Sequence, residues 1–242
     1  MFRSRRSDFL AVLFLAVLAA WPDWGAEGAK PDASSSSAVL ERFIVNQAEV
    51  PGWPLETMEI EASLPKLHQT GRLRAIRRLV PWGHPDYEVL EIAGDATVKK
   101  QVIARYISAD ERAADLPVST VAITPANYRI HYTGTVPDGD GLAYTFRVVP
   151  RKKREGLING ALWLDSATGV IVRESGYLAK SPSIFLKRVS VTRDNELHNG
   201  TIAARITHVS IETRLVGRAE LVIVERPAAD EMAARSAASE GQ

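Results

Sequence analysis

The most regular pattern in the chain is a period of two between apolar and polar residues. It is clearest at residues 57–64, where every even-numbered residue from Met58 to Leu64 is apolar and its neighbours are polar. Such alternation is typical of a β-strand with one buried face. Similar segments predict nine further strands, at residues 72–80, 87–92, 128–134, 142–149, 157–165, 170–177, 184–193, 202–215 and 218–224.

Two segments follow a helical period instead. Residues 38–48 bring Val39 and Phe43 to one side, and residues 95–107 repeat an apolar residue every four positions after Asp95, a good N-cap residue. No helix separates the later strands, so the sheet should be an antiparallel meander. A sheet of about ten strands curls, and its concave side must be filled. The pattern therefore predicts a mainly β fold with two or three helices: a single curled antiparallel sheet, or incomplete β-barrel, closed by helices.

The hairpin at residues 160–177 departs from simple alternation. Leu162, Trp163 and Leu164 are consecutive apolar residues, and residues 170–172 form a second apolar run after the turn. A strand with one wet face should not be apolar on both sides. We therefore expect the second face of this hairpin to be covered, by a helix, by a ligand, or by each in turn.

The amino terminus has the pattern of a secretory signal. Residues 1–8 are rich in arginine, and Phe9 to Ala20 is an apolar run that is too short to span a bilayer comfortably. Small residues between Ala19 and Ala26 offer several cleavage positions, which leaves the position open. The alternative is an uncleaved segment that anchors the chain in a membrane.

The predicted signal peptide is the first of four segments into which we divide the chain. We expect a signal peptide at residues 1–26 and a flexible, Ser-rich leader at residues 27–37. One half-barrel domain should cover residues 38–226, and residues 227–242 should form a frayed or disordered tail.

Charge and cysteine content exclude several functional classes. The chain has 30 basic and 29 acidic residues, so no field of one sign favours nucleic acid. Cysteine is absent, which excludes disulfides, thiolate metal sites and a lipid-modified amino-terminal cysteine. We therefore expect a protein of the periplasm or another secreted compartment, without a lipid anchor and without a nucleic-acid partner.

The order of elements and one local motif resemble a known superfamily. A leading helix, antiparallel strands, an inserted helix and a strand meander that contains Trp163-x-Asp165-x-x-Thr168-Gly169 are similar to the LolA-like periplasmic lipoprotein carriers and their LolB and RseB/MucB relatives. Gly217, before the last strand, is similar to their closing hairpin. The resemblance implies an incomplete barrel around an apolar cavity for acyl chains. It also implies a closing arginine, whose position in this chain the sequence does not identify.

The candidate ligand-binding residues are aromatic or aliphatic and share strand faces. On the carrier interpretation they line the cavity; on the simpler interpretation they fill an ordinary core. These candidates are Trp163, Tyr128, Tyr132, Tyr144, Phe146 and Val148. A separate cluster, Arg151 to Arg154, offers four positive charges to lipid head groups, acidic partners or nucleic acid, although such a tip is also typical of a solvated turn.

No pattern in the sequence indicates catalysis. The five histidines are isolated and have no metal-ligand spacing, and no nucleophile elbow, phosphate loop or dinucleotide motif is present. The carboxylates are expected mostly on solvent faces, so no acid/base pair stands out. We therefore predict a protein that is not an enzyme and has no cofactor, catalytic residue or metal site.

Two functions remain in view. The first is a secreted or periplasmic, monomeric binding protein that carries or senses lipid or lipoprotein acyl chains in an apolar barrel cavity, as in outer-membrane lipoprotein sorting. The alternative is an RseB-like envelope-stress regulator that acts by binding a membrane-protein partner. The RseB family carries a second, carboxyl-terminal domain, whereas the predicted strands here extend to residue 224 of 242.

Overall fold

A computed structural model describes residues 33–47, 53–80, 84–139, 141–183, 185–214 and 217–228. All of them belong to one compact unit. The predicted signal peptide, most of the leader and almost all of the predicted tail lie outside the described residues.

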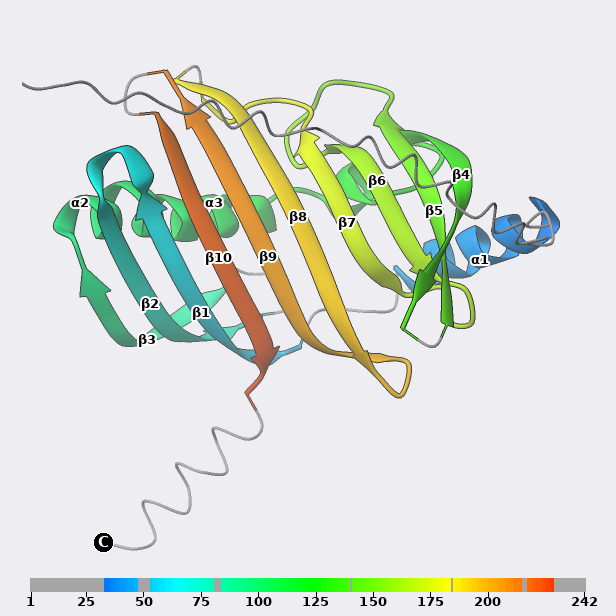
Figure 1. Cartoon of the computed structure of the whole chain (residues 1–242), viewed down its shortest axis with the longest axis horizontal. Coiled ribbons are helices and arrows are strands. Elements are labelled where there is room, and N and C mark those ends of the chain that lie inside the picture. The colour runs from blue at the N-terminus through cyan, green and yellow to red at the C-terminus, as the bar shows by residue number, and fades with distance from the viewer. Residues whose placement is uncertain are drawn as a thin grey trace, which may run out of the picture. The chain divides into compact units, whose positions relative to one another are not determined.

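One antiparallel sheet of ten strands dominates the structure (Figure 1). Its order is β3-β2-β1-β10-β9-β8-β7-β6-β5-β4, and β3 and β4 are its two free edges among the described residues. The strands are β1 (Leu55–Leu64), β2 (Gln69–Arg78), β3 (Asp86–Gly94), β4 (Tyr128–Asp138), β5 (Gly141–Pro150), β6 (Ile158–Asp165), β7 (Ile171–Leu178), β8 (Leu186–His198), β9 (Thr201–Thr213) and β10 (Arg218–Pro227). The sheet curls without closing, so the predicted fold class is confirmed.

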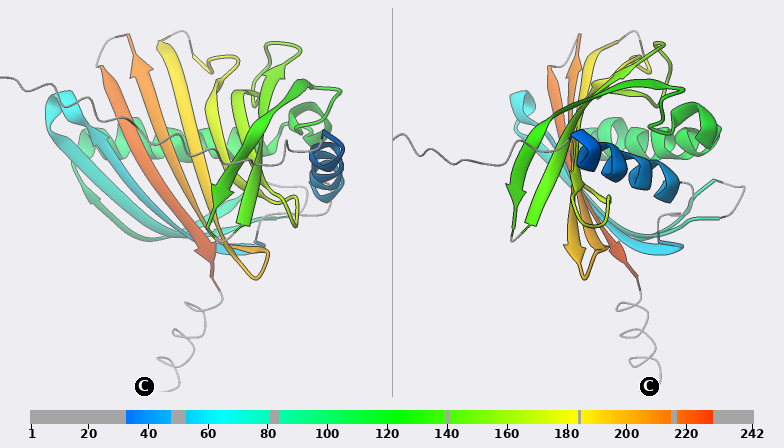
Figure 2. Two further views of the ribbon diagram at one scale, coloured as in Figure 1. Left: turned by 45° about the vertical axis from the view of Figure 1, so that its right-hand side comes forward. Right: turned by 90° about the vertical axis from the view of Figure 1, so that its right-hand side faces the viewer.

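Helices cover one face of this sheet (Figure 2). The first is α1 (Ala33–Asn46); a longer helix runs through α2 (Ala96–Val98), the π-helical segment η2 (Lys99–Ile103) and α3 (Ala104–Ala114). We call the latter the long helix. Two short elements complete the described fold, the 3₁₀ turn η1 (Pro65–Leu67) and α4 (Val118–Val121). We call the helix-covered side of the sheet the inner face and the other side the outer face.

The helices differ in detail from the prediction. Residues 33–37, expected in the flexible leader, form the first turn of α1, where Ser36 is buried. Asp95 precedes the long helix as predicted, but its carboxylate accepts a hydrogen bond from the Thr70 N–H (2.8 Å) and caps no helical N–H. The long helix also continues past residue 107, because its later part carries polar contacts to the sheet that an apolar period does not reveal.

Two separate apolar clusters hold the helices on the inner face. The long helix inserts Val98, Val102 and Ile103 against β1, β2, β9 and β10, where Met58, Ile60 and Ile223 have no exposed surface. We call this the long-helix cluster. Helix α1 inserts Val39 and Phe43 against β4, β5 and β6. The alternation in β1 thus reflects burial under the long helix.

A pair of glycines shapes the sheet between β6 and β7. Gly160 and Gly176 face each other across the two strands. A Cβ atom on Gly160 would lie 2.0 Å from the Ser175 carbonyl oxygen, and one on Gly176 would lie 2.6 Å from the Asn159 carbonyl oxygen. Only glycine fits this close approach, which is common where a sheet bends tightly.

Candidate functional site

The inner face under α1 is lined by aromatic and aliphatic side chains. Tyr128 and Phe146 are almost completely buried, and Tyr132 packs edge-on against Phe146, with ring centres 5.7 Å apart. We call this set the aromatic cluster; its members are Tyr128, Ile130, Tyr132, Tyr144, Phe146, Val148, Leu162 and Leu164. Five of the six predicted site residues are therefore brought together on one surface. Their role in ligand binding remains a prediction.

Two of the three tyrosine hydroxyl groups in the aromatic cluster, those of Tyr128 and Tyr132, have hydrogen-bond partners. The Tyr128 hydroxyl accepts a hydrogen bond from the Ile158 N–H (3.1 Å), and the Tyr132 hydroxyl lies 2.8 Å from the Thr135 hydroxyl. Burial raises the pKa of Tyr128, so its hydroxyl stays neutral near pH 7. The surface beneath α1 therefore presents mainly hydrocarbon.

Trp163, the sixth predicted residue, lies on the outer face. Its neighbours Leu162 and Leu164 are fully buried on the inner face, whereas Trp163 is half-buried and pairs with Arg173 across the hairpin. The Arg173 guanidinium lies 5.8 Å from the centre of the indole ring. Part of the second apolar face of this hairpin is thus covered by a neighbouring arginine, a cation–π arrangement, and Trp163 does not join the aromatic cluster.

Helix α1 is attached to the sheet by a small set of contacts. Val39 and Phe43 supply the buried apolar contact, and the Gln47 side chain both donates to and accepts from the backbone of Ile123 (3.1 and 3.0 Å). The Arg42 guanidinium donates a hydrogen bond to the Ala167 carbonyl in the β6–β7 turn. In the same turn, a Cβ on Gly169 would lie 3.2 Å from the Val39 carbonyl oxygen, so the turn touches the helix backbone. One cationic side chain thus ties α1 to this turn.

A row of charged side chains crosses the inner face beside the long-helix cluster. Arg77, Glu56, Glu225 and Arg205 follow one another on β2, β1, β10 and β9, and Arg193 and Glu174 continue the row on β8 and β7. We call these six residues the charged ladder. Its sequence signal is that each occupies the inward phase of a strand whose other inward residues are mainly apolar, as in Leu221-x-Ile223-x-Glu225.

Ion pairs connect the charged ladder to the long helix. The Arg77 guanidinium lies 2.5 Å from Glu56 and 2.7 Å from Asp110 of α3, and the Arg193 guanidinium lies 3.1 Å from Glu174. The Tyr87 hydroxyl also donates to Asp110. The contacts of Asp110 hold the later part of the long helix on the sheet, in addition to its apolar cluster. The expectation that carboxylates lie mostly on solvent faces fails for Glu56, Glu174 and Glu225, which are buried.

Burial sets the ionisation of this row. The Glu56 side chain has no exposed surface, its Oε2 atom has no hydrogen-bond partner, and burial raises the pKa of its carboxyl despite the adjacent Arg77. Burial also opposes the charge of Arg77, but Asp110 and Glu56 outweigh it and raise the pKa of its guanidinium. Burial, together with Arg193, lowers the pKa of Arg205. The ladder therefore joins buried carboxylates to arginines that are partly exposed at Arg193 and Arg205, and each buried charge is compensated by a neighbour of opposite sign.

A groove of about 500 Å³ lies elsewhere, at β10, β1, β2 and β3. Glu61, Arg72 and Glu220 contribute to its lining, and they are in the outward phase of their strands. The groove is therefore separate from the aromatic cluster. In the part of the chain that the structure describes, no helix combines the length and apolar character needed to cross a bilayer.

Comparison with known proteins yields structural similarities only. No family model matches the sequence, and no curated protein matches it. Among solved structures, the chain is similar to a LolA superfamily protein from Nitrosomonas europaea, with 10% identity, a TM-score of 0.41 and coverage of 78% of this chain and 90% of that one. It is also similar to a putative outer membrane lipoprotein-sorting protein domain from Vibrio parahaemolyticus, with 11% identity, a TM-score of 0.37 and coverage of 79% and 92%. A third similarity is to MucB, with 12% identity, a TM-score of 0.27 and coverage of 81% and 94%.

Proposed function

We propose that the chain is an exported binding protein that holds a lipophilic ligand between α1 and the aromatic cluster. The observation that carries this proposal is the cover of that cluster: α1 and the short segment at Val121 and Ile123 lie on it, where a sandwich would place a second sheet. The lining is aromatic and aliphatic, and its tyrosine hydroxyls at 128 and 132 are already hydrogen-bonded. Such a surface suits acyl chains of a lipid or lipoprotein.

The energetics allow α1 to exchange with a ligand. Burying Val39 and Phe43 stabilises the closed form by about 3–6 kcal/mol in total, at about 1.5–3 kcal/mol for each side chain. An acyl chain gains about 0.8 kcal/mol for each buried methylene, so about four to eight methylenes offset that loss. A fatty acyl chain is longer than this, and it therefore competes with α1 for the aromatic cluster.

A second candidate function, regulation through a protein partner, is favoured by the β3 edge. Val89 and Ile92 pair with Ala75 and Leu73, so they lie in the inward phase of β3, yet they are 54% and 48% exposed. An extended segment of a partner could add to this edge and cover both side chains. On this alternative the chain acts as an envelope sensor that binds a membrane protein, as the RseB-like interpretation implies.

Binding of a fluorescent fatty acid to two matched variants tests the first proposal. Tyr132→Ser removes a partly buried ring from the aromatic cluster, and Trp163→Ser removes a half-buried ring from the outer face. We expect the wild type to bind the probe and Tyr132→Ser to weaken binding about tenfold, the equivalent of about 1.4 kcal/mol of lost apolar contact. Trp163→Ser should leave the affinity unchanged.

Two results would contradict the proposal. One is a wild-type protein that binds no probe, with no lipid seen by native mass spectrometry of the purified protein. The other is an equal loss of affinity in both variants, which would mean that the probe binds away from the aromatic cluster. Amino-terminal sequencing of the exported protein checks the export part separately: we expect the mature chain to begin between Ala20 and Glu27.

A further inference from the structure

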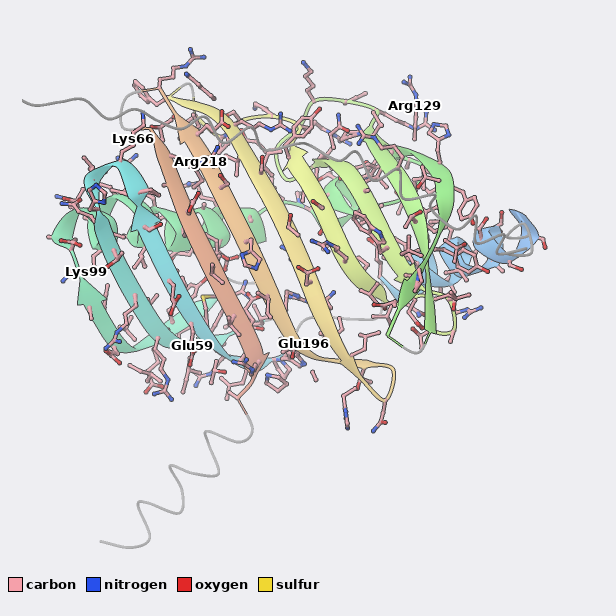
Figure 3. The ribbon with its side chains drawn as sticks, viewed as in Figure 1. Glu59, Lys66, Lys99, Arg129, Glu196 and Arg218 are labelled. Carbon is pink, nitrogen blue, oxygen red and sulfur yellow. The ribbon has the colours of Figure 1, made fainter. Side chains whose placement is uncertain are left out.

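The strand ends along one side of the sheet carry an excess of basic side chains (Figure 3). Lys66 and Arg129 are exposed at the side of the sheet where β1, β5, β7 and β9 end, and Arg218 also lies there. We call this row of strand ends and loops the basic rim; we assign to it the exposed residues Lys66, Arg129, Arg151, Lys152, Lys153 and Lys187. In the described parts of the loops at residues 65–68, 151–157 and 179–185, Glu155 is the one acidic residue, and Lys180 neutralises it at 2.9 Å.

Direct contacts join these loops into one surface. The Arg214 N–H donates to the Phe185 carbonyl (3.0 Å), and the Ala179 N–H donates to the Leu157 carbonyl (2.8 Å). At the β4 side, the Arg151 guanidinium donates to the Pro125 carbonyl (2.7 Å). The Lys66 side chain packs on Gly217, where a Cβ would lie 2.6 Å from its Cδ. The basic rim is therefore a continuous surface with fixed loops.

Large apolar side chains project from the same rim. Phe185 is 59% exposed and Leu67 is 47% exposed. Phe185 lies beside Arg214 through the backbone bond and is two residues from Lys187. An exposed aromatic ring among lysines and arginines is costly in water, but it matches the interface of a bilayer, where rings enter the head-group region and basic groups meet lipid phosphates.

The opposite end of the sheet is mixed in charge. Asp86, Asp138 and Glu196 are exposed there, but Arg78 lies 3.5 Å from Asp86, and Arg226 is exposed at the end of β10. An anionic surface would therefore attract the basic rim more strongly than the opposite end. This difference orients the molecule with the basic rim toward the surface.

We propose that the basic rim docks the protein on an anionic lipid surface, with Phe185 and Leu67 entering the interface. Acidic groups on a protein partner would match the charge of the rim, but they offer no apolar layer for Phe185 and Leu67. This docking does not depend on a ligand under α1, because the rim loops and the aromatic cluster share none of the residues named for either.

Co-sedimentation of the mature chain with lipid vesicles tests the docking. The probes are vesicles of phosphatidylglycerol and phosphatidylcholine in equal parts, and vesicles of phosphatidylcholine alone. We expect binding to the anionic vesicles only, and loss of binding when the salt is raised from about 0.1 M to about 1 M, which shortens the Debye length from about 10 Å to about 3 Å.

Variants locate the docking surface. Lys152→Gln/Lys153→Gln should lower the partition coefficient about 25-fold, because each basic group near an anionic surface contributes about fivefold. Phe185→Ser should lower it about tenfold. The matched control is Lys100→Gln/Arg105→Gln, which removes two exposed charges from the long helix and should leave binding near the wild-type level.

Three outcomes would overturn the docking. The first is equal sedimentation of the wild type with neutral and anionic vesicles. The second is equal loss in the rim and control double variants, which would reduce the effect to net charge. The third is unaltered vesicle binding of Phe185→Ser together with equally strong, salt-sensitive binding to polyglutamate, which would make the rim a site for acidic polypeptides. Fatty-acid binding by the rim variants should equal that of the wild type, so the two proposals fail separately.

Discussion

At the residue scale, Glu56 is a carboxyl side chain with no exposed surface. Its carboxyl pKa is raised above the ordinary value of 4.5 by burial, so the folded protein keeps this proton at pH values where the unfolded chain has lost it. The contribution of Glu56 to stability is therefore complete below about pH 4.5 and is lost as the pH rises through the raised pKa. Asp110 and the three glutamates of the charged ladder outnumber its three arginines, which agrees with the raised pKa of Glu56.

Glu56→Gln should remove this pH dependence. Below about pH 4.5 the variant replaces a neutral acid by a neutral amide, and the melting temperatures should be similar. As the pH rises, the wild type must charge a buried carboxyl, so the variant should gain stability relative to it. Thermal melts from pH 4 to pH 8 measure the difference, with Glu59→Gln, an exposed residue of the same strand, as the control. A difference that does not change with pH would show that Glu56 is ionised throughout.

Individual side chains were also the hardest to predict. The predicted strands at residues 57–64 and 218–224 stop one residue short of Glu56 and Glu225, which the structure includes in the inward phase of β1 and β10. Carboxylates are also usually exposed, so the sequence did not place these two on the buried face. Trp163, whose role in ligand binding remains a prediction, lies apart from the other five candidates for a different reason. Its hairpin is apolar on both faces and has an irregular register between Trp163 and Leu164, so periodicity alone does not assign the face.

At the element scale, all ten predicted strands are present. Period two is clearest where a strand buries one face, as in β1, β6 and β10, and is absent from the burial pattern of the edge strand β3. It could not locate the first turn of α1, whose serines have no strong period, or the π-helical segment of the long helix, where one extra residue per turn shifts the apolar face. The cover of the aromatic cluster was therefore predictable as a helix, but the side chains that hold α1 in place were not. Arg42 and Gln47 hold it through backbone carbonyl and amide groups of distant turns, and such partners leave no trace in a sequence pattern.

Arg42→Ala should loosen α1 without unfolding the sheet. The variant loses a hydrogen bond to the Ala167 carbonyl that is exposed to solvent, so we expect about 1 kcal/mol less stability for the closed form. The uncovered population, and with it the association rate of a fluorescent fatty acid, should rise about fivefold. Stopped-flow mixing measures the rate, and Glu41→Ala, at the adjacent exposed position, is the control. An unchanged rate would mean that α1 does not gate the aromatic cluster.

At the scale of the whole molecule, the inner face is divided between two cores. The long-helix cluster extends to Val189 of β8 and packs against Leu178 of β7, whereas the aromatic cluster lies on β4, β5 and β6. The β7–β8 pair has five matched residues, from Arg173–Asp194 to Tyr177–Ser190, whereas β8 and β9 are matched over most of their length. Its contacts include the polar pairs Glu174–Arg193 and Ser175–Thr192. The sheet is continuous through its backbone, but the two apolar clusters share no residue.

This division predicts two units that open separately in native-state hydrogen exchange. Phe43→Ala removes the main apolar contact of α1, at a cost of about 3–5 kcal/mol, and should lower amide protection in β4 to β7 while β1, β2 and β10 keep theirs. Ile103→Ala should do the reverse, because its side chain belongs to the long-helix cluster. Equal loss of protection in all strands from either variant would show one cooperative unit. Separate opening would let the aromatic cluster become accessible while the rest of the sheet stays folded, as a binding protein with a movable cover requires.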